Sequence, residues 1–508
     1  MQKAPASRIA ELTNLAAKRK NEILNTKSDY PKGRKTYYFD DIGGNDDNDG
    51  LSPETAFKTI DKTGNYDFEE GSVVLFKRGG LWRGVLTLCD GVTYSAYGEG
   101  EKPKFYGSID ASDPDNWIKT KYENVWMFRP EINYVRDVGC IIINGGKLWG
   151  IKVCLNLKEG VRCDGTDDVF NGRSYVHRER VPFKGPQDLK GDLEFLHYYN
   201  NERLYIYCAD GNPGKVFDSI ELNIRRNITR GGGRNCLIDN LCFMYAGIHA
   251  MGHGGRDIRV QNCEFGWIGG SNQFPEHQLL GLKCPFGDDT TRLGNGCEVY
   301  GGAENYYVNN CYFHQIYDAA ITAQYMNANV GDKDFIMQNI EWSNNVIDTS
   351  NYCFELWLAI QNKNENTRVE MNNVHIHDNI CTNAGLGWGN QRPDKGSAFF
   401  YGDPQHTVCK FNDVVFYDNI FLNSYGRISC ARMMGKDNGM YFKHNEIYSN
   451  TKVLGVHCAD LKDRTTELKP IPATDENLKM LIDGGYWEDC SFYTFDKDEN
   501  VSEPYIKY

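Results

Sequence analysis

Residues 308–313 read Val308-Asn-Asn-Cys-Tyr-Phe313, and a second run, Ala319-Ala-Ile-Thr-Ala323, follows shortly after it. Apolar and polar residues alternate in both runs, which is typical of β-strands that bury one face. An asparagine followed two or three positions later by an apolar or aromatic residue recurs seven times between residues 240 and 447. A motif that returns along the chain indicates repeated units rather than one central core.

The seven occurrences differ in the spacer that separates the asparagine from the apolar residue. They read Asn240-Leu-Cys-Phe243, Asn262-Cys-Glu-Phe265, Asn310-Cys-Tyr-Phe313, Asn345-Val-Ile347, Asn379-Ile-Cys381, Asn419-Ile-Phe421 and Asn445-Glu-Ile447. Successive asparagines are 22, 48, 35, 34, 40 and 26 residues apart, which predicts a unit of 22 to 26 residues with loop insertions of different lengths. We interpret the asparagines as structural, because asparagine at a recurrent turn bonds neighbouring backbone groups.

Such units predict coils that stack about 4.8 Å apart, with each strand paired to its equivalents above and below. The expected fold class is therefore all-β, a parallel β-helix with loop insertions. We expect residues 36–454 to form this β-helix, with a β-rich insertion around residues 115–225. Residues 455–508 are polar and acidic, and we expect them to cap the open end, since an uncovered coil exposes strand edges.

The N-terminal segment, residues 1–35, is expected to contain a short amphipathic helix. Residues 1–26 carry scattered lysine and arginine without a central apolar block, which does not fit a secretory signal. Several of the 17 cysteines fall inside the repeats as small core residues: Cys242, Cys263, Cys311 and Cys381. We therefore predict reduced thiols and a cytoplasmic protein; the alternative is a secreted protein whose signal peptide has been removed.

Charge and hydropathy limit the class of partner. The chain has a formal net charge of -13 and a pI near 5.4, which speaks against nucleic acid or an anionic membrane surface. The sequence contains no run of 18 apolar residues, so no membrane span is expected. The acidic balance of the chain favours an uncharged or weakly charged substrate. Tyr and Phe together number 56, which fits a β-rich protein with aromatic surface.

Three N-terminal stretches carry a family resemblance. They read Gly44-Asn-Asp-Asp-Asn-Asp-Gly-Leu-Ser-Pro-Glu-Thr-Ala-Phe-Lys-Thr-Ile-Asp-Lys62, Gly71-Ser-Val-Val-Leu-Phe-Lys-Arg-Gly-Gly-Leu-Trp-Arg-Gly84 and Gly91-Val-Thr-Tyr-Ser-Ala-Tyr-Gly-Glu-Gly-Glu-Lys-Pro-Lys-Phe105. They resemble the start of bacterial right-handed parallel β-helix proteins that act on carbohydrates, the pectate-lyase-like superfamily. The resemblance extends over roughly residues 36–450. It implies a right-handed coil and an oligosaccharide or polysaccharide partner.

The groove for such a partner is predicted from the insertions. Residues 326–333, 359–367 and 388–406 follow the same part of the repeated unit, and loops stacked on one side of a coil form the wall of a groove. The strand before each loop then forms its floor. Alternation directs Asp318, Thr322 and Gln324 outward on one such strand. On the neighbouring strands it directs outward Glu298, Tyr300, Glu355 and Trp357.

Carboxylates on apolar strands indicate the chemistry. In Gly296-Cys-Glu-Val-Tyr300 and Cys353-Phe-Glu-Leu-Trp357 a glutamate interrupts an apolar run, and hydrolysis of a glycosidic bond needs two such carboxyls. The catalytic candidates are Asp318, Glu355 and Glu298. Adjacent coils would separate two carboxyls by about 5 Å, as in retaining enzymes, and alternate coils by about 9.5 Å, as in inverting ones. We favour a pair that includes Asp318; the structural alternatives are a turn cap for Asp318 and a solvated polar ladder for the glutamates.

Aromatic and amide side chains near these carboxyls suit sugar binding, because rings pack on flat sugar faces and polar groups fix hydroxyls. The substrate-binding candidates are Trp357, Gln324, Tyr300, Trp388, Gln391, Arg392 and His277. The sequence therefore predicts a glycoside hydrolase without a cofactor. The alternatives are a polysaccharide lyase or uronate epimerase, which would need Lys or Arg at the floor, and a non-catalytic carbohydrate-binding protein.

One acidic turn, Asn45-Asp-Asp-Asn-Asp-Gly50, raises the question of calcium. It lacks the distal bidentate glutamate of an EF-hand loop, and short acidic turns commonly act as caps. Calcium is therefore the less favoured interpretation of this turn.

Overall fold

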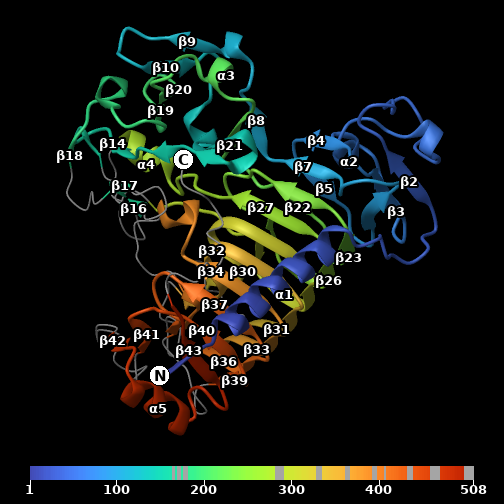
Figure 1. The fold of residues 1–508 in the computed structure, drawn as a ribbon. Coiled ribbons are helices and arrows are strands. Elements are labelled where there is room, and N and C mark those ends of the chain that lie inside the picture. The colour runs from blue at the N-terminus through green and yellow to red at the C-terminus, as the bar shows by residue number, and fades with distance from the viewer. Residues whose placement is uncertain are drawn as a thin grey trace.

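The molecule is a stack of coils in which most strands pair with their counterparts one coil before and one coil after (Figure 1). It is a computed structural model. The structure describes residues 1–162, 166–168, 173–175, 181–280, 291–327, 334–360, 367–391, 398–404, 408–431, 439–457 and 469–496.

One side of the stack is a ten-stranded sheet in which every pairing is parallel. Its strands, in spatial order, are β2 (Thr36–Phe39), β3 (Val73–Lys77), β6 (Thr93–Tyr97), β23 (Arg234–Asp239), β26 (Gly255–Gln261), β29 (Ala303–Asn309), β31 (Phe335–Ser343), β33 (Val369–His377), β36 (Cys409–Tyr417) and β39 (Met440–Lys443).

The other two sides join into one sheet, because two long strands turn a corner and belong to both. These are β30 (Tyr312–Asn327) and β32 (Val346–Ile360). The side that follows the asparagine turns contains β4 (Leu81–Arg83), β7 (Lys104–Tyr106), β24 (Cys242–Met244), β27 (Glu264–Ile268), β34 (Ile380–Ala384), β37 (Ile420–Ser424), β40 (Glu446–Tyr448) and β43 (Ser491–Thr494). The remaining side contains β25 (Met251–Gly252), β28 (Cys297–Tyr300), β35 (Ala398–Pro404), β38 (Ser429–Ala431) and β41 (Val453–His457), while β5 (Leu86–Leu88) pairs with β22 (Thr229–Gly231).

The three sides enclose one continuous apolar core. Phe243, Phe265 and Phe313 occupy equivalent positions in successive coils and stack with ring centroids 5.3 and 4.6 Å apart. Cys263, Cys311 and Cys381 lie in the core, which confirms the prediction for these three. Cys242 is buried as well, but it lies beside Glu264 and outside the core cluster. The predicted right-handed parallel β-helix is thus confirmed, together with its N-terminal helix. Most of the predicted insertions, namely residues 328–333, 361–366, 392–397 and 405–406, lie outside the described residues.

The seven asparagines form two ladders and not one. In the shorter motifs the side chain of Asn345 donates to Asn379 at 3.0 Å, and Asn379 donates to Asn419 at 2.9 Å. These residues are fully buried. In the longer motifs the asparagine lies one position earlier and has positive φ, as in Asn262 (φ 55) and Asn310 (φ 53). The spacer length therefore reports which of two neighbouring turn positions the asparagine occupies.

Helix α1 (Ala6–Leu24) lies along the outside of the stack (Figure 1). Strand β1 (Gln2–Lys3) pairs with β43, so the N-terminus is at the same end of the stack as the last coils. Ile9 and Leu12 pack against Leu422 and Tyr448 near that end, and Ile23 packs against Tyr312 and Val346 of earlier coils. The helix thus buries its apolar face over several coils.

Between β7 and β22 the chain leaves the stack and forms smaller sheets of mainly antiparallel strands, here called the insertion. One sheet contains β9 (Trp117–Lys119), β10 (Val125–Phe128), β13 (Ile151–Lys152), β19 (Glu194–Tyr198) and β20 (Arg203–Tyr207). A second contains β8 (Ser108–Asp110), β11 (Val138–Ile143), β12 (Leu148–Trp149) and β21 (Ile220–Ile224). Shorter pairings join β14 (Leu155–Asn156), β15 (Val161–Arg162) and β18 (Val181–Pro182), and β16 (Thr166–Asp168) with β17 (Arg173–Tyr175).

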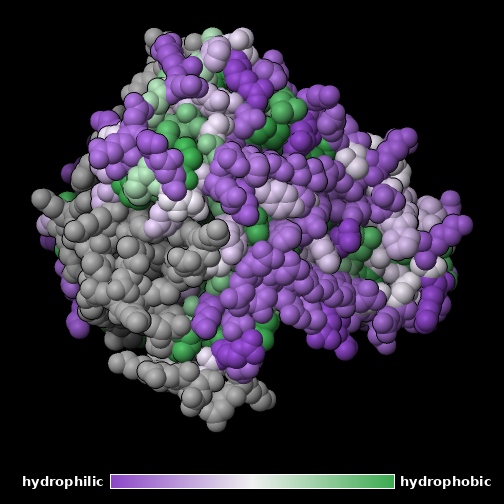
Figure 2. Space-filling model, turned by 90° about the horizontal axis from the view of Figure 1, so that it is seen from below, coloured by the Kyte–Doolittle hydropathy of each residue, from purple (hydrophilic) through white to green (hydrophobic). Residues whose placement is uncertain are grey.

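The last described residues lie at the end of the stack where β1 pairs with β43. Strand β42 (Lys469–Pro472) pairs antiparallel with β41, and helix α5 (Asp475–Asp483) follows it. The remaining α-helices are short: α2 (Lys62–Asn65), α3 (Pro213–Val216) and α4 (Pro275–Leu280). Within the described part of the chain, no helix is both long and apolar enough to cross a membrane. The face shown in Figure 2 is largely hydrophilic, with hydrophobic residues in small patches.

Candidate functional site

Three polar residues occupy one register position on successive strands, and we call them the carboxylate column: Glu298, Thr322 and Glu355. Glu298 of β28 and Glu355 of β32 both pair with Thr322 of β30, from its two sides. The flanking residues of these strands, among them Ile321 and Phe354, lie in the coil core, so the column faces outward as predicted. Two inter-strand steps separate the glutamates, which corresponds to about 9.5 Å between their Cα atoms.

The column faces outward but is not open to solvent. Glu298 is 8% exposed, Glu355 is 9% exposed and Thr322 is fully buried. Glu355 Oε2 accepts a hydrogen bond of 2.6 Å from the Gln324 amide and one of 3.3 Å from the Thr322 hydroxyl. Two donors therefore converge on this one oxygen.

Glu298 has a different neighbour. His249 Nε2 lies 2.7 Å from Glu298 Oε2, and the imidazole is itself buried. The backbone N–H of Asn295 donates to His249 Nδ1 at 3.0 Å. The two glutamates therefore share one column but have chemically distinct surroundings, which is the condition for an acid and a base of the same residue type.

A second column, two residues further along the same strands, contains Tyr300, Gln324 and Trp357, and we call it the aromatic column. Tyr300 is 40% exposed, while Gln324 and Trp357 are half-buried. The strand rise places it about 6.6 Å from the carboxylate column. Two aromatic side chains thus flank an amide beside the carboxyls, as the sequence predicted for sugar binding.

Asp318 lies elsewhere on β30. It precedes Thr322 by four residues and lies within an irregularity of the β30–β32 register, and this corresponds to roughly 13 Å along the strand. Its backbone N–H donates to Gly294 O at 2.9 Å, and its side chain is half-buried. Thr322, and not Asp318, therefore occupies the position between the two glutamates, and the adjacent-coil pairs that include Asp318 are not formed in register.

Trp388 does not offer a ring face to a substrate, so that prediction is wrong. Its side chain is fully buried, with its ring centroid 5.0 Å from that of Tyr317 and its indole N–H donating to Gln315 O at 2.8 Å. Gln391 is likewise buried, and its amide donates to Gly150 O of the insertion at 3.1 Å. In a glycine-rich loop, an aromatic residue that packs inward has the same sequence pattern as one that faces a groove.

Two further candidates have no described side chain. Arg392 lies outside the described residues, and only the backbone of His277 is described, within α4. Their assignment to substrate binding stays a prediction from sequence.

The acidic turn at residues 45–50 uses its side chains as local caps. Asp46 accepts hydrogen bonds from the backbone N–H groups of Lys58 and Thr59, both at 2.9 Å. Asp49 accepts from the Leu51 N–H at 3.0 Å and from the Thr55 hydroxyl at 2.7 Å. These carboxylates stabilise the turn that leads into the first coil.

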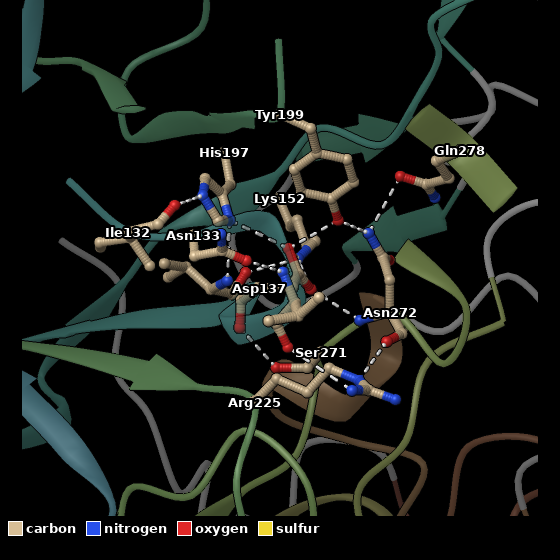
Figure 3. Close-up of polar contacts among 12 residues, drawn as sticks. Ile132, Asn133, Asp137, Lys152, His197, Tyr199, Arg225, Ser271, Asn272 and Gln278 are labelled. Atoms are coloured by element: carbon tan, nitrogen blue, oxygen red, sulfur yellow. Dashed lines mark hydrogen bonds and ion pairs between the residues drawn. The ribbon is translucent and has the colours of Figure 1, made fainter. Parts of the chain in front are cut away.

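A buried polar network joins the insertion to the coils (Figure 3). Lys152 Nζ lies 2.6 Å from Asp137 Oδ2, and Asp137 also accepts from the Tyr199 hydroxyl at 2.8 Å and from the backbone N–H of Asn272 at 2.7 Å. Burial acts to raise the pKa of Asp137, but the Lys152 charge and the hydrogen bonds hold it well below its ordinary value. Because Asn272 belongs to the coil segment after β27, this network fixes the insertion beside the stack.

Sequence reasoning missed two residues at the site. Nothing in the segment around His249 distinguishes it from a core histidine, because its contact with Glu298 depends on a turn in the preceding coil. Tyr401 pairs with Glu355 in register and extends the carboxylate column. Tyr401 could have been found from sequence alternation, because Phe400 lies in the core and the next residue along a strand then points outward.

No protein-family model matches the chain, and no curated protein matches its sequence. Among solved structures, XylC in complex with xylose is 14% identical over 83% of this chain and 68% of that chain, with a TM-score of 0.44. A lacto-N-biosidase from Eubacterium ramulus is 13% identical over 91% and 68%, with a TM-score of 0.33. The tailspike protein of E. coli bacteriophage HK620, in complex with a pentasaccharide, is 12% identical over 80% and 62%, with a TM-score of 0.33. At these identities the likeness concerns the fold alone.

Proposed function

We propose that this protein is a glycoside hydrolase that cleaves an oligosaccharide between Glu298 and Glu355. The observation that carries the proposal is the carboxylate column, in which two nearly buried glutamates lie on either side of Thr322. Burying two carboxyls costs free energy, and a site that performs acid–base chemistry explains that cost.

The spacing favours an inverting mechanism. The Cα atoms of the two glutamates are about 9.5 Å apart. Carboxyl groups with a similar separation would lie at the wide end of the range of roughly 6.5–9.5 Å in which a water molecule fits between the second carboxyl and the sugar. In this mechanism the acid donates its proton to the glycosidic oxygen as the bond to the anomeric carbon breaks. The base takes a proton from water as its oxygen attacks that carbon from the opposite side. The products are the leaving alcohol and a sugar of inverted anomeric configuration.

The contacts of the two glutamates support different roles for them. Glu355 accepts from Gln324 and Thr322 through one oxygen, which suits the carboxylate that activates water. Glu298 is the proposed acid, because one of its oxygens contacts His249 and the other is left for the proton. Tyr300 and Trp357 of the aromatic column are proposed to pack on the sugar rings.

A lyase or uronate epimerase would use the same fold differently. Both abstract a proton next to a substrate carboxylate, which requires a cation to stabilise the resulting charge. The described residues at the register positions of the two columns include no lysine or arginine, and this favours hydrolysis.

The test is a panel of neutral and acidic oligosaccharides, followed for reducing sugar and for ultraviolet absorbance of an unsaturated product. Hydrolysis releases reducing sugar without new absorbance. Growth of absorbance would mean elimination and would overturn the proposal. For any substrate that is cleaved, proton NMR in the first minutes identifies the anomer that is released, and a retained configuration would contradict the Glu298–Glu355 pair.

A further inference from the structure

Both ring nitrogens of His249 have a polar neighbour. Nδ1 accepts the backbone N–H of Asn295 at 3.0 Å, and Nε2 lies 2.7 Å from Glu298 Oε2. The residue is 7% exposed. Its own backbone N–H donates to the side chain of Asn227 at 3.2 Å, which fixes the start of the side chain as well.

These contacts specify where the ring carries its proton. A nitrogen that accepts a hydrogen bond has no proton of its own, so Nδ1 is bare and a neutral ring carries its proton on Nε2. A second proton, on Nδ1, would replace the Asn295 hydrogen bond with a clash of two N–H groups. The geometry therefore presents an N–H group to Glu298.

Gly252 makes room for this arrangement. It pairs with Glu298 in register, so it lies directly beside the glutamate on the preceding coil. A Cβ atom at this position would lie 3.2 Å from His249 Cδ2 and 2.6 Å from the side-chain nitrogen of Asn227. A side chain at this position would therefore have to displace the Asn227 amide and shift the imidazole.

We propose that His249 is the positioning residue for Glu298: its Nε2–H, with the nitrogen 2.7 Å from Oε2, attracts that oxygen and so directs Oε1, with its proton, toward the glycosidic oxygen. This role rests on the proposed hydrolase function. Among the residues that the structure describes, His249 is the only side chain in polar contact with Glu298. No other described contact would fix the rotation of this carboxyl, so its orientation depends on the imidazole.

The chain supplies a matched control in a second buried pair. His314 Nε2 lies 3.3 Å from Glu264 Oε1 on the side of the stack that carries β27. Like His249, His314 is at most 9% exposed, and it is not part of the carboxylate or aromatic columns. Substitutions of His314 therefore measure the general cost of removing a buried imidazole.

The kinetic test compares His249→Leu and His249→Gln with the same two substitutions at His314. We expect H249L to lower kcat by about 30-fold or more while KM changes by less than about 3-fold, because the proton transfer and not the binding is affected. H249Q, which keeps an N–H donor, should recover at least about 3-fold of that loss. H314L and H314Q should stay within about 2-fold of wild type. Normal turnover in H249L, or equal losses at the two histidines, would overturn the positioning role.

The spectroscopic test needs no substrate. In protein labelled with ¹⁵N-histidine, the ring signals that disappear in H249Q and persist in H314Q belong to His249. We expect these signals to show the Nε2–H tautomer. A ring protonated on Nδ1, or on both nitrogens at neutral pH, would overturn the proposed contact. If wild type cleaves no glycoside, the proposed function fails and the positioning role fails with it. The spectra then still decide whether the predicted tautomer exists.

Discussion

Glu298 and Glu355 both pair in register with Thr322, one from each neighbouring coil. The hydroxyl of Thr322 donates to Glu355 at 3.3 Å, while Glu298 turns to His249 on its other side. The coil geometry thus sets the separation of the two carboxyls, and the residues beside them set their different surroundings. The predictions below follow from these and related contacts.

Substitution of either glutamate should abolish most activity. Glu298→Gln and Glu355→Gln are each expected to lower kcat/KM by about 100-fold or more, because an amide neither donates nor accepts the required proton. Asp318→Asn should have a clearly smaller effect, since Asp318 lies outside the column. Initial rates on the cleaved oligosaccharide measure all three. Glu304→Gln, at an ion pair with Arg256 on the ten-stranded sheet, is the control. A larger loss for Asp318→Asn than for the glutamates would return the catalytic pair to one that includes Asp318.

The aromatic column should affect binding more than turnover. Removing the ring in Trp357→Ala or Tyr300→Ala takes away a surface against which a sugar packs, and we expect KM to rise by about 10-fold with a smaller change in kcat. Tyr307→Ala removes a ring that lies under Arg259 on the ten-stranded sheet, and it should leave both constants near wild type. Unchanged KM in both column variants would show that the sugar lies elsewhere.

Breaking the buried pair in the network between insertion and coils should be costly. Lys152→Met leaves Asp137 as an uncompensated buried charge, for which we expect a loss of about 3–5 kcal/mol in unfolding free energy. Urea denaturation followed by fluorescence measures it. Lys479→Met, which removes an exposed pair with Asp483 on α5, should cost less than about 1 kcal/mol. If the two substitutions cost the same, the network does not stabilise the fold in the way described.

The same carboxylate makes stability depend on pH. The pKa of Asp137 is lowered in the folded protein, so in acid the unfolded chain binds a proton before the folded one does. The stabilisation is fully present above the ordinary aspartate pKa of about 4 and declines as pH falls below it. Denaturation between pH 3 and 6 should show this slope in wild type and a weaker one in Asp137→Asn. An exposed-site control, Asp61→Asn, should keep the wild-type slope; equal slopes in all three proteins would refute the assignment.

The buried asparagine ladder should contribute measurably to stability. Asn379→Ala removes an amide that bonds Trp342 O at 3.0 Å and Asn419 at 2.9 Å, and it leaves the backbone N–H of Asn345 without its acceptor. We expect a cost of about 1–3 kcal/mol. Asn412→Ala, at an exposed amide pair with Asn372, should cost about 0.5 kcal/mol or less. Thermal unfolding of the two variants compares the buried ladder with the exposed pair.

The fold was predictable because its signal is repeated and local. Alternation along each strand correctly directed Ile321 and Phe354 into the core and Glu355 outward. From sequence, the two asparagine ladders were treated as one, because a spacer of one or two residues looked like variation of a single motif. The positive φ of Asn310 shows that the longer motifs place their asparagine at a different turn position.

The site was only partly predictable, because register between coils depends on the length and path of the intervening loops. Sequence alternation gave Asp318, Thr322 and Gln324 the same outward direction, but it could not place Asp318 within an irregularity of β30. The burial of Trp388 likewise depends on Tyr317 and Gln315 of a coil distant in sequence. His249 reaches Glu298 across a turn, and no local pattern reports such a contact.

Helix α1 and strand β1 are synthesised first but pack against coils that are synthesised much later. The first strand pairs with β43, the last strand of the stack, so it cannot dock until almost the whole chain has emerged. Stacked repeats normally unfold piecemeal, since each contacts only its neighbours. Helix α1 contacts Tyr312 near one of its ends and Tyr448 near the other. Unfolding of a coil between these residues would therefore also break contacts with the helix. The N-terminal segment therefore docks last in folding, and its contacts make the coils unfold cooperatively and not one by one.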